Sequence, residues 1–183
     1  MTIRSVLLNK EPLWQENRVG MRHTLPESVQ SWTYESGSLT QRLRAVYGDK
    51  VAVTVLFQPW RVPFLTERKL LKLPEQRLCL TREVLLHIDN KPLILARTII
   101  PAATIKIASS LAHLGTRPLG EVIFSYPKLE RLAMDVTLIH PPIWTQNALT
   151  IAAIQQPIWG RRTVYAINHR QMLVSEFFLP EIL

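Results

Sequence analysis

The fold depends on the stretch Leu78-Cys79-Leu80-Thr81-Arg82-Glu83-Val84-Leu85-Leu86-His87-Ile88. Side chains alternate between the two faces of a strand, so its even positions place five apolar groups and the guanidinium of Arg82 on one face. Near the other end of the chain, residues 172–178 repeat the pattern with Glu176 as the charge. A buried charge is costly without a partner. The sequence therefore predicts two strands with two open interpretations: opposite ends of a polar pocket, or a buried structural ion pair between Arg82 and Glu176.

The length and composition predict one domain spanning residues 1–183. A chain of 183 residues with 47% hydrophobic residues and a mean hydropathy of +0.06 can fill a single core. Its one cysteine, Cys79, excludes an internal disulfide and a cysteine-based metal cluster. The only apolar run near the N-terminus is Val6-Leu7-Leu8, too short for a signal peptide or a membrane span. We therefore expect a cytoplasmic protein with no membrane insertion, and a monomer.

The charge pattern argues against nucleic acid as the partner. The net charge is +8 and the isoelectric point is about 10.1, but no run of basic residues is longer than two. Nucleic-acid-binding surfaces usually gather their basic residues on one face and carry a recognisable motif, and no such motif is present. The positive balance instead predicts a field that attracts small anions.

The first half of the chain predicts an irregular arm, two helices and a hairpin. Residues 1–24 show no strong period. A helix is expected from a Thr24 cap through Trp32, and a second over 39–47 that stops at Gly48. Residues 51–57 read as a strand and 58–75 as an exposed excursion. The turn 89–92 should join the strand of Arg82 to a strand over 93–100.

The second half predicts further helices and a C-terminal hairpin. Residues 104–114 and 118–124 read as helices separated by Gly115. The stretch 126–158 fits either a helix or a strand in its first part. Residues 163–167 and 172–178 read as two strands. The expected class is α+β: one antiparallel sheet of five or six strands with helices on one side.

Several kinds of catalysis have no recognisable motif in this sequence. Its six glycines form neither G-x-G-x-x-G nor a P-loop, and its five histidines show no metal-ligand spacing. No G-x-S-x-G elbow marks a serine nucleophile. We therefore expect no cofactor and no metal, and a reaction that depends mainly on positioning.

Five blocks along the chain resemble one family, the bacterial chorismate lyases. The blocks are 80–86, Ala96-Arg97-Thr98-Ile99-Ile100-Pro101, Leu114-Gly115-Thr116-Arg117-Pro118-Leu119-Gly120, Trp159-Gly160-Arg161-Arg162 and Glu176-Phe177-Phe178-Leu179-Pro180. The resemblance covers roughly residues 25–180. It implies a single sheet under two helix-turn-helix flaps, and an enzyme that converts chorismate into 4-hydroxybenzoate and pyruvate in ubiquinone biosynthesis. The stretch 138–156 is longer than the family pattern.

The resemblance also implies the site residues. Arg82 matches the family arginine that binds a carboxylate, and Glu176 matches the glutamate at the hydroxyl end of the product. Glu176 would either orient that hydroxyl or shuttle a proton. Leu39 and Leu119 match positions that bind substrate through backbone N–H groups, although Leu39 stands where methionine is familiar. The roles of Arg161 and Arg162, as charges near the pocket or solvated groups, stay open.

The resemblance leaves a second function to consider. Effector-binding domains of some bacterial repressors share this fold and bind small ligands without converting them. Such a domain normally follows a DNA-binding winged helix, and too few residues precede the first expected helix to form one. We therefore expect the enzyme rather than the effector domain.

Overall fold

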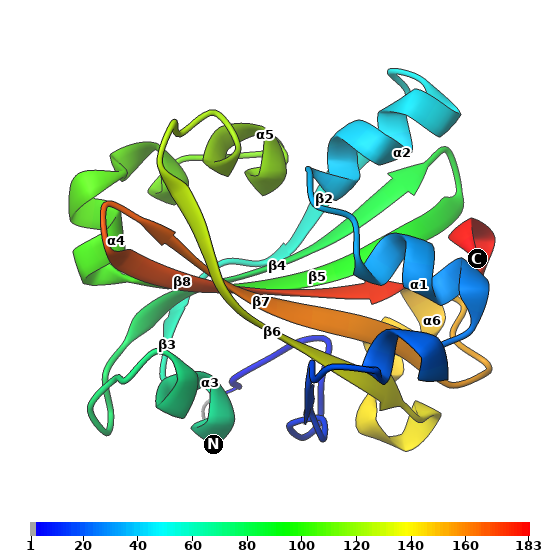
Figure 1. The fold of residues 1–183 in the computed structure, drawn as a ribbon, viewed down its shortest axis with the longest axis horizontal. Helices are drawn as coiled ribbons and strands as arrows, with labels where there is room; N and C mark the ends of the chain where they lie inside the picture. The colour runs from blue at the N-terminus through cyan, green and yellow to red at the C-terminus, as the bar shows by residue number, and fades with distance from the viewer. Residues whose placement is uncertain (1–2) are drawn as a thin grey trace.

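The computed structural model describes residues 3–183, and one antiparallel sheet organises them (Figure 1). Its strands are β1 Gln15–Glu16, β2 Ala52–Phe57, β3 Trp60–Arg61, β4 Cys79–Ile88, β5 Lys91–Pro101, β6 Leu129–Ile139, β7 Ile158–Ile167 and β8 Arg170–Phe178. They lie in the order β1-β6-β7-β8-β5-β4-β2, and β3 also pairs with β4. The α+β class is confirmed.

The predicted number of strands was wrong: the sheet has eight, not five or six. Two of the additional strands, β1 and β3, have two residues each. A period of two cannot be recognised over so short a length. In the ambiguous stretch 126–158, β6 forms because it pairs with β7 along its whole length, which shows that tertiary pairing decided a local ambiguity.

Two hairpins set the register at the centre of the sheet. In the first, β4 pairs with β5 and places Arg82 opposite Thr98. In the second, Asn168 and His169 turn β7 into β8 with φ values of 46° and 63°, the positive angles that two-residue hairpin turns require. The strands β5 and β8 then pair so that Glu176 lies opposite Ala96. Arg82 and Glu176 are therefore two strands apart and offset by two residues, or about 12 Å between Cα atoms.

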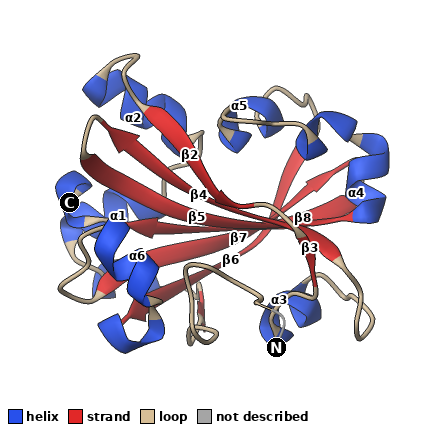
Figure 2. Cartoon of the chain, turned by 180° about the vertical axis from the view of Figure 1, so that it is seen from behind, coloured by secondary structure: helices blue, strands red, loops and turns tan. Residues whose placement is uncertain are grey.

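We call the side of the sheet that carries Arg82 the Arg82 face and the opposite side the Glu83 face. Four helices cover the Arg82 face: α1 Glu27–Thr33, α2 Leu39–Tyr47, α4 Ala102–Ile107 and α5 Leu119–Ile123. In Figures 1 and 2, α2 and α5 lie on the same side of the sheet. The helix over 39–47 is confirmed, with the Ser38 hydroxyl accepting from the Gln41 N–H and Gly48 at its end with φ 77°.

Two helix boundaries differ from the prediction. The first helix begins at Glu27 after Pro26, and Thr24 lies in a preceding 3-10 turn, where its hydroxyl donates to the Met21 carbonyl. The helix expected over 104–114 is divided into α4 and a 3-10 turn at Ser109–Ala112. In both places the spacing of apolar residues was read correctly, but this spacing did not determine where the helix begins or is interrupted.

The prediction of helices on one side was wrong, because α3 Leu65–Leu70 and α6 Gln146–Ile151 lie on the Glu83 face. The longer stretch 138–156 forms α6 and contributes Trp144, which packs edge-on against Phe177 at 5.1 Å between ring centroids. The excursion 58–75 contains β3 and α3 and is only partly exposed. Both segments therefore build a second core rather than surface loops.

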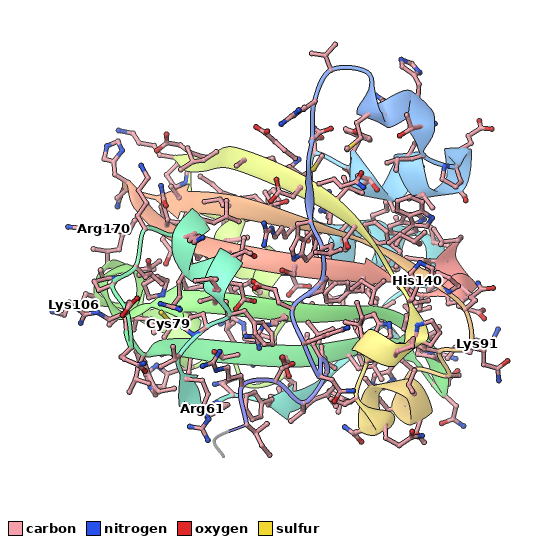
Figure 3. The ribbon with its side chains drawn as sticks, turned by 90° about the horizontal axis from the view of Figure 1, so that it is seen from below. Arg61, Cys79, Lys91, Lys106, His140 and Arg170 are labelled. Atoms are coloured by element: carbon pink, nitrogen blue, oxygen red, sulfur yellow. The ribbon has the colours of Figure 1, made fainter. Side chains whose placement is uncertain are left out.

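The N-terminal arm, described from residue 3, contains β1 and the 3-10 turn at Met21–Thr24 and crosses the Glu83 face (Figure 3). Buried charges hold it there. The Glu83 carboxylate accepts from the Ser5 hydroxyl and from the Val6 N–H at 2.7 Å, and it also receives Arg97 at 2.6 Å. Arg97 also binds Glu67 at 2.7 Å, and both Arg97 and Glu83 are almost fully buried. Each charge in this network has partners, so its burial is compensated.

We expect Glu83→Ala to lower the free energy of unfolding by about 3–5 kcal/mol, because it leaves the buried Arg97 with one carboxylate fewer and releases the arm from its anchor. Denaturant unfolding measures the loss. The control is Glu181→Ala, which removes an ion pair to Lys91 at the surface and should change stability little. Equal losses in the two variants would contradict the anchoring role of Glu83.

Candidate active site

A pocket lies between the Arg82 face of the sheet and the first turns of α2 and α5. The space free of protein atoms around it, which includes open solvent at its mouth, is about 600 Å³. The strands supply an apolar floor that includes Val84, Ala96 and Val174, and the helices supply Leu39 and Leu119 above it. Arg82 and Glu176 also line this pocket, so the structure brings together all four residues that the sequence singled out.

Arg82 is a buried cation whose hydrogen bonds all go to neutral groups. Its side chain donates to the Gln58 side-chain oxygen, to the Gly115 carbonyl at 2.9 Å and to the Arg117 carbonyl at 3.3 Å. None of the ion pairs within residues 3–183 includes it. Burial lowers the pKa of the Arg82 guanidinium, because desolvation disfavours the charged form. An anion entering the pocket would offset that cost.

Glu176 is paired, but its partner is Arg161 rather than Arg82. The Arg161 Nε donates to Glu176 Oε2 at 2.8 Å, and the arginine is 1% exposed. Burial by itself would lower the pKa of Arg161, but the nearby Glu176 carboxylate raises it above its usual value. Arg161 is therefore a buried charge that holds Glu176, a residue of the pocket lining. The interpretation of Arg82 and Glu176 as a structural ion pair is wrong.

Arg162, the next residue, points to the opposite side of the sheet. Its Nε donates to Asp135 Oδ2 at 2.7 Å on the Glu83 face, and its side chain is 7% exposed. Period-two alternation in β7 separates the two arginines. Arg161 holds Glu176, which lines the pocket, and Arg162 belongs to the other core, so neither arginine is a solvated surface group.

The two helix starts above the pocket touch each other. The N–H groups in the first turn of a helix have no partners within it, and α2 and α5 begin at Leu39 and Leu119. A Cβ atom added to Gly120 would lie 2.5 Å from the Ser38 hydroxyl oxygen, so only glycine allows this approach. An ion pair between Arg44 and Glu121 also joins the two helices. The roof of the pocket is thus formed by the starts of two helices that are held together.

Comparison with known proteins identifies the family. A family model described as "Chorismate lyase" matches residues 8–183. The chain belongs to the chorismate lyase family. A relative from Methylococcus capsulatus is 42% identical over 156 residues, covering 85% of this chain and 96% of the relative. One from Thiobacillus denitrificans is 35% identical over 161 residues, covering 86% of each chain. Both carry the name "Probable chorismate pyruvate-lyase".

Solved structures of other proteins resemble this chorismate lyase family member in fold alone. A transcriptional regulator of the GntR family from Bacillus cereus superposes with a TM-score of 0.56 at 17% identity, covering 74% of this chain and 95% of the regulator. At that identity the regulator shows the shared α+β architecture and not a shared activity.

Two residues that bear on the site were not singled out from the sequence: Tyr165, which lines the pocket, and Gln58, which binds Arg82. Tyr165 faces the pocket from β7 and is 3% exposed; burial raises its pKa. It lies four positions after Arg161, so the same alternation could have found it. Gln58 binds Arg82 from the irregular segment between β2 and β3. No periodic signal exists there, so only the tertiary structure reveals its position.

Among residues 3–183, no three histidine, cysteine or acidic side chains cluster as metal ligands would. No helix in that part of the chain is long and apolar enough to cross a membrane. Cys79 is fully buried, and burial raises the pKa of its thiol to about 12, which leaves it unreactive.

Proposed function

We propose that this chain is a chorismate lyase, which eliminates pyruvate from chorismate and leaves 4-hydroxybenzoate, the first committed step of ubiquinone biosynthesis. The observation that carries the proposal is Arg82, a buried cation with only neutral partners at one end of an apolar pocket. A buried cation of this kind favours an anionic ligand. Relatives covering most of this chain carry the matching name.

The pocket suggests how the substrate is oriented. The planar fork of Arg82 can hold the ring carboxylate through two hydrogen bonds. Glu176, about 12 Å away along the sheet, would accept a hydrogen bond from the hydroxyl at the opposite end of the ring. The N–H groups of Leu39 and Leu119 would contact the substrate from the roof, as the family resemblance implies. Apolar strand residues between the two charges would hold the ring itself.

The proposed reaction needs little covalent chemistry from the protein. The C3–O bond to the enolpyruvyl group breaks, the hydrogen at C4 leaves, and the ring becomes aromatic. That hydrogen can pass to the methylene carbon of the departing group, which becomes the methyl group of pyruvate. Aromatisation supplies the driving force, so the proposal involves neither a metal nor a cofactor. The protein contributes orientation, a donor-lined site for developing negative charge and exclusion of water.

A direct assay tests the proposal. Purified protein is mixed with chorismate, and 4-hydroxybenzoate is followed by absorbance while pyruvate is measured by a coupled reaction. We expect equal amounts of the two products. Calorimetry with chorismate is run in parallel. Binding without conversion would reject the lyase and favour the alternative, a non-catalytic domain for small ligands with the same fold.

We expect product release to depend on the ion pair between the flaps. Glu121→Gln removes the pair to Arg44, and surface pairs of this kind change an equilibrium only modestly. Release of 4-hydroxybenzoate should become about two- to fivefold faster, measured by stopped-flow displacement. Glu27→Gln removes the same charge from an exposed position on α1 and is the control. Identical release rates in both variants would contradict a role of the pair in closing the flaps.

We also propose that residues 1–183 act as one domain, as a monomer, in the cytoplasm. One sheet connects strands from both ends of the described chain, which supports a single folding unit. The partners in this proposal are chorismate and its two products, with no nucleic acid. Light scattering on the purified protein tests the monomer, since a doubled mass would reject it.

A further inference from the structure

Arg161 makes more contacts than an ion pair with Glu176 needs. Besides its Nε contact with the carboxylate, its Nη1 donates to the Thr33 carbonyl and the Glu35 carbonyl, both at 2.9 Å, and to the Trp32 carbonyl at 3.4 Å. These carbonyls belong to the last turn of α1 and to the connection between α1 and α2. One buried guanidinium therefore joins the pocket floor to the base of the first flap.

A second arginine holds the same connection from outside. Arg131 in β6 donates to the Glu35 carbonyl at 3.2 Å and to the Ser36 carbonyl at 3.2 Å, and its Nη2 also lies 3.0 Å from the Tyr165 hydroxyl. Three residues after Ser36, the chain enters α2 at Leu39, which lines the pocket. The position of this helix start is thus fixed by bonds to residues of the sheet.

We propose that Arg161 is a positioning residue for the lyase reaction: it fixes the direction of the Glu176 carboxylate and, through the Thr33 and Glu35 carbonyls, the height of the Leu39 N–H above the pocket. This inference rests on the proposed function and adds a residue that does not touch the substrate. Displacements of about 1 Å at reacting groups can cost a hundredfold in rate. Replacing a side chain that orients two substrate contacts at once would produce such displacements.

If the ion pair between Arg161 and Glu176 were purely structural, a different result would be expected, and Arg162 provides the comparison. It is the adjacent residue, it is similarly buried, and its pair with Asp135 has nearly the same length. It points to the Glu83 face and touches nothing in the pocket. If Arg161 only stabilises the fold, changes at the two arginines should have the same consequences.

The experiment compares Arg161→Met, Arg161→Lys and Arg162→Met by thermal unfolding, by kcat and KM for chorismate, and by affinity for 4-hydroxybenzoate. We expect all three to be less stable. Arg162→Met should keep kcat within about twofold of the unchanged protein. Arg161→Met should lower kcat at least tenfold and weaken 4-hydroxybenzoate binding. Arg161→Lys should recover part of the loss, because one ammonium can meet Glu176 but cannot also reach the carbonyls.

A double-mutant cycle with Glu176→Ala, which removes the acceptor of the Arg161 Nε hydrogen bond, tests whether Arg161 acts through Glu176. The kcat loss caused by Arg161→Met, or by Arg161→Lys if the methionine variant does not fold, should be at least threefold smaller in the Glu176→Ala background. An undiminished loss, an unchanged kcat in Arg161→Lys, or failure of both variants to fold would overturn the proposal. The unchanged protein separates the two claims: if it does not convert chorismate, the proposed function fails first.

Discussion

Arg82→Ala should lower kcat/KM for chorismate on the order of a thousandfold or more while the protein stays folded. Removing one preorganised donor typically costs a hundred- to a thousandfold, and Arg82 offers a bidentate fork. The fold should survive because the arginine bonds only to Gln58 and to two carbonyls, and its removal leaves no carboxylate unpaired. Steady-state kinetics and thermal unfolding of the same preparation measure both effects.

Two further variants make this prediction specific. Arg82→Lys keeps the charge but not the planar fork, so it should recover only a small part of the activity. Arg77→Ala removes the same charge from an exposed residue just before β4 and should leave kcat/KM nearly unchanged. If Arg77→Ala lost as much activity as Arg82→Ala, the general positive field rather than the fork would account for substrate binding. Unfolding of Arg82→Ala would assign the arginine to the core instead.

Glu176→Ala should lower kcat/KM at least about a hundredfold and also destabilise the protein. The change removes the acceptor proposed for the substrate hydroxyl, and misplacing a reacting group costs about this much. It also leaves Arg161 as a buried cation without its carboxylate, a loss of about 3–5 kcal/mol in typical buried pairs. Kinetics and denaturant unfolding of the variant measure the two effects separately.

Glu176→Gln separates the two roles that the carboxylate can have. The amide keeps the shape and can still accept from Arg161 Nε, but it cannot transfer a proton. If Glu176 orients the substrate hydroxyl, kcat should fall less than about tenfold and the affinity for 4-hydroxybenzoate should change more than the rate. We expect this outcome, because the C4 hydrogen can reach the enol carbon without a protein relay. A loss of a hundredfold or more in kcat would instead indicate a proton shuttle.

Much of the central sheet could be predicted from the sequence, because the sequence signals that specify it are local. Alternation along 78–88 and 172–178 predicted two strands and placed Arg82 and Glu176 on pocket-facing sides. The turn residues at 89–92 and 168–171 predicted the two hairpins. The end of α2 at Tyr47 followed from Gly48, the stop signal after it. Each of these signals acts within a few residues of the feature it specifies.

The partners of the charges were decided by the tertiary structure. Arg161 and Glu176 are opposite each other because β7 and β8 pair in one particular register. The alternation of side chains along one strand does not indicate which residues of the neighbouring strand lie opposite them. The assignment of Arg97 and Glu83 to a second core, and of α3 and α6 to the Glu83 face, likewise depends on which segments return to cover that face. By itself the sequence determined which face of each strand carries a charge. Long-range packing decided that Glu176 is held by Arg161 and that Arg82 keeps its guanidinium free of any carboxylate within residues 3–183, because strand order and register bring together residues that lie far apart along the chain.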